Sequence, residues 1–128
     1  MADDEQALIE LATKIFGFAR AGQTTELVAY LDAGTPANLA NDRGDTLVML
    51  AAYHGNADTV RALLKHGADP DLANDIGQTP LAGAVFKGEN EVVAALVDGG
   101  ADPNAGTPSA IETARMFGKD DLLSLFTS

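Results

Sequence analysis

Cysteine is absent from this 128-residue sequence, and its absence excludes several kinds of chemistry. A chain without thiols has no disulfide framework, no thiolate nucleophile and no cysteine-based zinc site. The sequence also lacks the run of about 18 apolar residues that a membrane-spanning helix needs. Its first residues, Met1-Ala2-Asp3-Asp4-Glu5, have the wrong charge for a secretory signal. Together these features predict a cytoplasmic protein.

Basic residues are scarce. Eight Lys and Arg stand against nineteen Asp and Glu, which gives a formal net charge of −11. Such a charge repels a phosphate backbone at long range, so we expect neither nucleic acid nor an anionic membrane as a partner. Apolar residues still make up 46% of the sequence, which is enough for one folded domain over residues 1–128.

Motifs that carry catalysis are missing as well. The sequence has no Gly-rich phosphate loop, no Gly-x-Ser-x-Gly turn and no clustered acid–base pair. His54 and His66 fall at opposite ends of one repeating unit, where His66 is expected to stabilise a helix C-terminus and not to bind a metal. Asp69, Asp71 and Asp102 lack the dense spacing of a calcium loop and are better explained as turn caps. We therefore expect no enzyme, no cofactor and no metal.

A repeat of 33 residues runs through the sequence. The segment Leu39-Ala40-Asn41-Asp42 recurs 33 positions later as Leu72-Ala73-Asn74-Asp75. Glycines mark the same register at Gly22, Gly55 and Gly88, and at Gly118 after a connection that is three residues shorter. A fixed period of this length is typical of solenoid proteins, in which one small structure is stacked several times.

Each period predicts two helices and a loop. The Thr79 hydroxyl can accept from an unpaired backbone N–H at a helix start, and Pro80 is well suited to the first helical position. A short apolar helix follows over 81–86, as it does over 47–53 in the preceding period, and a second helix with helical apolar spacing comes next. Turn-rich loops are expected near residues 35–45, 68–78 and 102–109.

Glycine ends the second helix of each period. Gly67 and Gly100 are expected to adopt positive φ, which a residue with a Cβ avoids. On this basis Gly100→Val should destabilise the fold more than Gly99→Val does.

The first and last units differ from the middle ones. The first has a longer amphipathic helix, which Asp3 or Asp4 can cap. Its apolar residues at helical spacing are Leu8, Leu11, Ile15 and Phe18. The last unit is shortened. We interpret both as caps that cover the two ends of the core.

These residues resemble the ankyrin repeat, whose signature is a Gly-x-Thr-Pro-Leu start, an Ala-Ala pair, a Gly between helices and a Gly-Ala-Asp-x-Asn exit. The third repeat has Gly77-Gln78-Thr79-Pro80-Leu81 and Gly100-Ala101-Asp102-Pro103-Asn104, and the second has Ala51-Ala52. Met49, Ala82 and Glu112 replace the family's usual histidine. The resemblance implies an all-α ankyrin solenoid of four stacked helix-turn-helix units with hairpin loops, over about 5–38, 39–71, 72–104 and 105–128.

The resemblance also implies a binding surface, because ankyrin arrays contact partners through a concave groove lined by first helices and hairpin tips. The matching helix positions are Arg20, Tyr53, His54, Phe86, Lys87, Met116 and Phe117. The matching hairpin positions are Asp42, Arg43, Asp45, Asp75, Ile76 and Gln78. We predict an aromatic and basic strip there, although Tyr53, Phe86 and Phe117 are equally explained as wedges between adjacent repeats.

The predicted function is that of a monomeric scaffold that binds a protein partner. Two alternatives remain open. Small stand-alone bacterial ankyrin proteins include accessories of redox enzymes such as catalases, so this chain can be an accessory or regulator of that type, in the periplasm if a signal segment precedes it. It can also be a small-molecule binder, which a deep pocket with perturbed titratable groups would favour.

Overall fold

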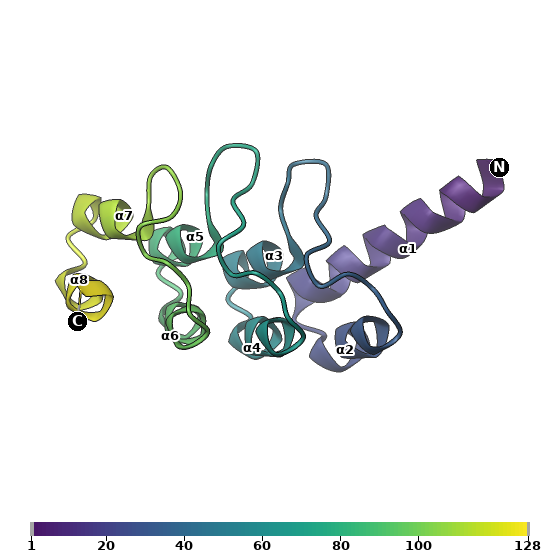
Figure 1. Ribbon diagram of the computed structural model, residues 1–128, viewed down its shortest axis with the longest axis horizontal. Helices are drawn as coiled ribbons and strands as arrows, with labels where there is room; N and C mark the ends of the chain where they lie inside the picture. Colours follow the sequence, from purple (N-terminus) through teal and green to yellow (C-terminus); the bar gives the residue numbers. More distant parts are fainter. Residues whose placement is uncertain (1, 128) are drawn as a thin grey trace.

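The computed structural model of the protein describes residues 2–127, and this part of the chain forms eight α-helices and no strand. The helices are α1 (Ala2–Ala21), α2 (Thr24–Asp32), α3 (Leu47–Tyr53), α4 (Ala57–Lys65), α5 (Pro80–Lys87), α6 (Asn90–Asp98), α7 (Ala110–Met116) and α8 (Asp120–Thr127). Consecutive helices pair antiparallel, and the pairs stack in one direction (Figure 1). The predicted all-α solenoid is confirmed.

The helices form two layers with the core between them. The odd-numbered helices make one layer and the even-numbered helices the other, while the loops extend past the odd-numbered layer (Figure 1). Each odd-numbered helix packs against the even-numbered helix of its own pair. Neighbouring odd-numbered helices also pack against each other, α1 with α3, α3 with α5 and α5 with α7. The largest fully buried side chains come from both layers and include Leu47, Leu63, Leu81, Val85 and Leu96. One continuous apolar core therefore runs along the stack.

Buried hydroxyls define the starts of three helices. Thr46, Thr79 and Ser109 each accept a hydrogen bond from the backbone N–H three residues later, at 3.1, 3.2 and 3.1 Å. These donors belong to Met49, Ala82 and Glu112, the three residues that replace the family's histidine. The Glu112 carboxylate also accepts from the Ser109 N–H at 3.0 Å and completes a capping box. The Thr and Thr-Pro starts predicted from the sequence are confirmed.

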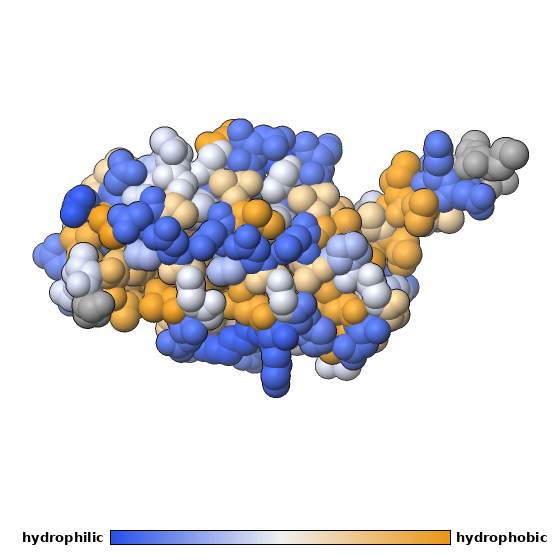
Figure 2. All heavy atoms as spheres, in the orientation of Figure 1, coloured by the Kyte–Doolittle hydropathy of each residue, from blue (hydrophilic) through white to orange (hydrophobic). Residues whose placement is uncertain are grey.

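Helix α1 departs from the prediction in two respects. It begins at Ala2, so Asp3 and Asp4 lie within the helix and not ahead of it as caps. Leu8 and Leu11 are exposed, because the N-terminal part of α1 projects past the stack (Figures 1 and 2). The helix has 20 residues, whereas α2 has 9 and α3 has 7, so these neighbours are too short to cover it. Only its C-terminal half packs, through residues such as Ile15.

The loops are fastened to one another by hydrogen bonds across repeats. The Asp75 N–H donates to the Arg43 carbonyl at 3.0 Å, and the Thr107 N–H donates to the Gly77 carbonyl at 2.9 Å. The Asp71 carboxylate accepts from the Asp102 N–H at 2.8 Å. The two backbone bonds hold neighbouring hairpins side by side. The bond to Asp71 shows that a loop carboxylate has a structural role.

Gly67 and Gly100 both have φ +89°, as predicted. Gly99 has an ordinary backbone, but a Cβ placed there would collide with the Leu64 side chain. A comparison of Gly100→Val with Gly99→Val therefore mixes backbone strain with a steric clash. The sequence could not show this, because Leu64 lies on the preceding repeat.

Alanine substitutions at Gly100 and Gly17 separate the two effects. We expect Gly100→Ala to lower the free energy of unfolding by about 1 kcal/mol, because Ala is disfavoured at positive φ. Gly17 lies inside α1 with nothing within 4 Å of an added Cβ, so Gly17→Ala should raise it by about 0.5–1 kcal/mol through helix propensity. Urea unfolding measures both values, and a change of the same sign in the two variants would contradict the assignment.

Candidate functional site

Two adjoining depressions lie where the hairpin tips meet the C-terminal ends of the odd-numbered helices, and together we call them the groove. The polar depression has about 470 Å³ and is lined by Arg20, Asn41, Asp42, Arg43, Asp45, Met49, Leu50, Tyr53, His54, Asn74 and Gln78. The apolar depression has about 230 Å³ and is lined by Ile76, Gln78, Ala82, Phe86, Thr107, Pro108, Thr113, Met116 and Phe117. Gln78 lines both, so the two depressions adjoin at this residue.

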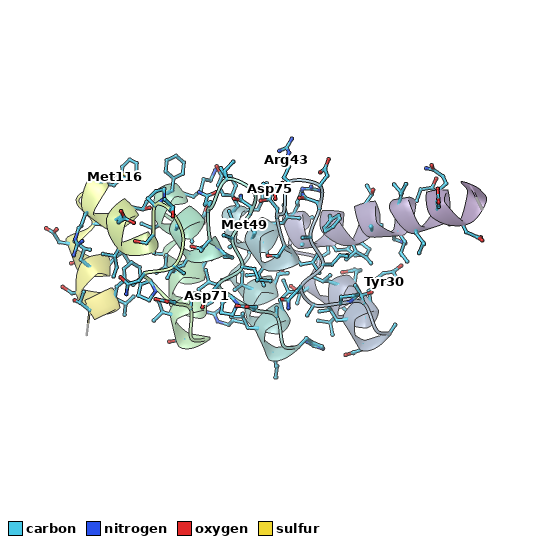
Figure 3. The ribbon with its side chains drawn as sticks, turned by 45° about the horizontal axis from the view of Figure 1, so that its top comes forward. Tyr30, Arg43, Met49, Asp71, Asp75 and Met116 are labelled. Atoms are coloured by element: carbon cyan, nitrogen blue, oxygen red, sulfur yellow. The ribbon has the colours of Figure 1, made fainter. Side chains whose placement is uncertain are left out.

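The residues predicted for a binding surface are brought together here. Eleven of the thirteen predicted residues line one depression or the other. Lys87 lines neither, but it reaches the polar depression by placing its Nζ 4.9 Å from the centre of the Tyr53 ring. Asp75 lies outside both depressions, although it is close to Arg43 on the neighbouring hairpin (Figure 3). Arg43 and Met116 face the same side of the molecule, in different repeats (Figure 3).

Asparagine side chains build the hairpin tips of the polar depression. Asn41 Oδ1 accepts from the N–H groups of Arg43 and Asp45, both at 3.0 Å. Asn74 Oδ1 accepts in the same way from Ile76 at 3.2 Å and Gln78 at 3.0 Å. The Asn74 amide also donates to Asp45 Oδ1 at 2.9 Å, which links the two tips. This linkage fixes where Arg43 and Ile76 stand.

The arginines of the polar depression are free to bind. No hydrogen bond or ion pair connects the Arg20 or Arg43 guanidinium to another group in residues 4–127. Arg43 is held only through its backbone, and the Arg20 carbonyl accepts from the Asn56 amide at 2.8 Å. Both residues line the depression, and the hydrogen-bond donors of their guanidinium groups are unused.

Tyr53 both lines the groove and packs between repeats. Its side chain is half-buried, and a Cβ added at Gly83 of the next repeat would lie 3.5 Å from Tyr53 Cδ1 and 3.1 Å from Met49 Cε. The missing Cβ thus leaves room for Tyr53 and Met49 at the floor of the groove. Sequence reasoning did not select Met49 or Gly83, although a glycine inside an apolar helix is a signal of close approach.

The apolar depression is framed by four exposed side chains. Ile76 is 79% exposed, Phe86 55%, Met116 64% and Phe117 51%. The Phe86 and Phe117 rings meet edge to face, with 5.7 Å between their centres and 71° between their planes. Both rings are thus about half exposed, and their contact also joins the third repeat to the fourth. A cluster of exposed apolar side chains marks an interaction site more often than not.

Polar and apolar side chains are unevenly distributed along the groove. Arg20, Arg43, Tyr53 and His54 line the polar depression, which extends to Asn74 and Gln78 of the third repeat, whereas the exposed apolar residues belong to the third and fourth repeats. The sequence register assigned residues to a common surface but could not order them by chemistry, because that order depends on which side chains meet across repeats.

His66 lies away from the groove, at the C-terminal end of α4, and does not share a surface with His54. Its Nδ1 is 2.9 Å from the Ala62 carbonyl oxygen and its Nε2 is 2.9 Å from Asp32 Oδ1 of the previous repeat. Both neighbours are acceptors, so the contacts favour the doubly protonated ring. The hydrogen bond to the Ala62 carbonyl and the bond to Asp32 raise the pKa of His66 above its ordinary value.

This contact makes stability depend on pH. Because the pKa of His66 is raised on folding above 6.5, its stabilisation is fully present below that value and is lost as the pH rises through the folded-state pKa. We expect His66→Gln to lower the melting temperature, relative to the parent protein, more at about pH 5.5 than at about pH 8.5. Asp32→Asn should reproduce that trend. A deficit that is equal at the two pH values would refute the charged contact.

Comparison with known proteins agrees with this architecture. The family model described as ankyrin repeats (three copies) matches residues 15–107. A protein of Pseudomonas aeruginosa that is named as an ankyrin repeat protein is 50% identical over 52 residues, which are 41% of this chain and 30% of that relative. The chain thus matches less than a third of the relative's length. Among the described residues, no helix has the length and apolarity required to cross a membrane.

Proposed function

Since the chain belongs to the ankyrin-repeat family, we propose that it is a protein-binding module and that its groove takes up a partner protein. Ankyrin repeats are generally protein–protein interaction modules and typically act as scaffolds without catalysis. One observation carries the assignment to the groove. Ile76, Phe86, Met116 and Phe117 are all exposed, although each is apolar, and they gather around one depression. A partner that covered them would remove this apolar area from water.

The outer layer has a different character. Asp58 and Glu91, in the first turns of α4 and α6, are exposed and charged. The large exposed apolar side chains of the middle repeats are Leu72, Ile76 and Phe86, and two of these line the groove. In the middle repeats the exposed apolar side chains therefore lie mostly on the groove side, whereas Leu8, Ile9 and Leu11 form a second exposed apolar group on α1.

The shape of the groove favours a protein over a small molecule. Its two depressions adjoin at Gln78 and extend across several repeats, so a ligand that filled both would be elongated. Small-molecule sites enclose most of their ligand, whereas this surface is framed by exposed side chains such as Ile76 and Arg43. A protein segment laid along the repeats fits these features best.

Affinity capture from the native host tests the proposal and identifies the partner, including the redox enzyme suggested by analogy. We expect the parent protein to recover a specific partner. The Tyr53→Ala/Phe86→Ala variant should lose it, with affinity weakened roughly 30-fold or more, because hot-spot aromatics contribute about 2 kcal/mol. A variant of the outer layer, Asp58→Asn/Glu91→Gln, should recover it unchanged. These two carboxylates are replaced by amides because a positive charge in the first turn would disturb the helices.

Two controls keep the result interpretable. Tyr53 also packs against Gly83, so the variant must retain its helical circular dichroism and its cooperative melting. A second variant, Phe86→Ala/Phe117→Ala, removes two half-exposed rings that contact each other; it must pass the same folding test and should weaken binding in the same direction. Loss of the partner in the outer-layer variant, or its retention in both groove variants, would place the site elsewhere.

A further inference from the structure

We propose that the groove recognises a protein segment with acidic side chains at one end and apolar side chains at the other. This inference rests on the proposed function and specifies the chemistry of the partner. It follows from the uneven distribution of side chains along the groove, in which unpaired cations and exposed apolar residues line two adjoining depressions.

The polar depression is rich in cations for so acidic a chain. Arg20, Arg43 and Lys87 are three of the eight Lys and Arg residues, whereas Asp42 and Asp45 are two of the nineteen acidic residues. Asp45 already accepts a hydrogen bond from Asn74, while both guanidinium groups have unused donors. Guanidinium groups bind carboxylates through paired hydrogen bonds, so a carboxylate is the group that this end fits.

The overall charge limits how the acidic groups are distributed in the partner. A net charge of −11 repels an acidic protein at long range. Screening confines this repulsion to about 8 Å at physiological salt, so contacts inside the polar depression are decided by its own charges, Arg20 and Arg43 against Asp42 and Asp45. The segment is therefore expected to carry a small local cluster of Asp or Glu and not to belong to a uniformly acidic surface.

The other end of the groove selects apolar side chains. Among the described residues, no charged one lines the apolar depression, and its lining includes Ala82 and Pro108. Phe86 and Phe117, whose rings contact each other edge to face, both line it. An acidic side chain placed there would lose its hydration without gaining a partner, whereas an aliphatic or aromatic one would bury apolar area.

The helix spacing sets the length of the segment. Helices α3 and α7 are separated by two packing steps of about 8–10 Å each, which gives roughly 16–20 Å along the groove. A helical segment of about 11–13 residues, or an extended one of about six, spans this distance. The acidic cluster and the apolar anchors should therefore be separated by that length within one continuous segment.

Selection from a randomised twelve-residue peptide display library tests this chemistry without knowledge of the natural partner. We expect the parent protein to enrich peptides with Asp or Glu toward one end and aliphatic or aromatic residues toward the other. Against Arg20→Gln/Arg43→Gln the acidic preference should disappear while the apolar one remains. Against Phe86→Ser/Phe117→Ser the reverse should hold.

One selected peptide, synthesised with a fluorophore, then gives the magnitudes. Its affinity should fall at least tenfold for Arg20→Gln/Arg43→Gln but less than twofold for Arg61→Gln/Lys65→Gln, a matched loss of two charges on α4. Replacing its carboxylates by amides should cost at least tenfold with the parent protein and little with the arginine variant.

Three outcomes overturn the inference: enrichment without acidic residues, an equal loss in the α4 variant, or no enrichment above bare resin. Each is distinguishable from failure of the proposed function. Capture of a host partner that depends on Phe86 but is unaffected by Arg20→Gln/Arg43→Gln would leave the binding module standing and remove the acidic requirement. Capture that depends on neither would remove the groove itself.

Discussion

Leu81→Ala is expected to lower the free energy of unfolding by about 3 kcal/mol, within the range of fully buried Leu→Ala changes. Leu81 lies at the start of α5 and is 1% exposed. Helix α5 packs against α3, α6 and α7, so a cavity at this point weakens contacts within one repeat and to both neighbours. Urea or thermal unfolding followed by circular dichroism measures the loss.

Leu123→Ala is the matched control for this change. Leu123 is half-buried in α8, a helix without any fully buried residue, so the same truncation should cost much less. Equal losses for the two variants would mean that the terminal repeat is as tightly packed as the third, which contradicts the structure described here.

Asn74→Ala is expected to destabilise the protein by about 2 kcal/mol, because it removes three hydrogen bonds. Its side chain accepts from the N–H groups of Ile76 and Gln78 and donates to Asp45 across the repeat boundary. The tip that carries Ile76 and Gln78 would lose its internal support, so groove binding should weaken together with stability. Chemical denaturation and peptide affinity report the two effects separately.

Asn41→Ala isolates the bond between repeats. Asn41 makes the same two internal bonds, to Arg43 and Asp45, but within residues 4–127 its amide donates no bond to a neighbouring repeat. The Asn74 variant should therefore be less stable than the Asn41 variant by about 1 kcal/mol. Asp45→Ala should add little to Asn74→Ala if the two side chains act as one pair. Independent, additive losses would show that the linkage between tips does not stabilise the fold.

Much of the fold could be predicted because each repeat encodes its own boundaries locally. Thr79 and Pro80 start α5, and Gly100 provides the positive φ after α6, so the sequence around them is sufficient. The prediction was wrong for the start of α1. Residues near an end give no local signal of how far a helix extends when its neighbours are too short to cover it.

The surface depended more on contacts between repeats. The register placed Arg43, Phe86 and Phe117 on a common side, and the structure brings each to the groove. The register did not show that the arginines and the exposed apolar residues line different depressions. Nor did it show that Met49 and Tyr53 pack against Gly83 of the next repeat. Those features arise where side chains from residues about 33 positions apart come into contact, and the local sequence of one repeat does not specify such contacts.

The nearest-neighbour packing of the stack has a consequence for folding and motion. Contacts that join residues one repeat apart give a low contact order, so the chain is expected to fold fast and to unfold from its ends inward. Helix α8 buries none of its residues fully, whereas α3 and α5 lie at the centre. The apolar end of the groove therefore borders a terminal repeat that frays readily, while Arg43 lies on the hairpin that precedes the central helix α3. One end of the groove can adapt its shape to a partner while the other holds its position.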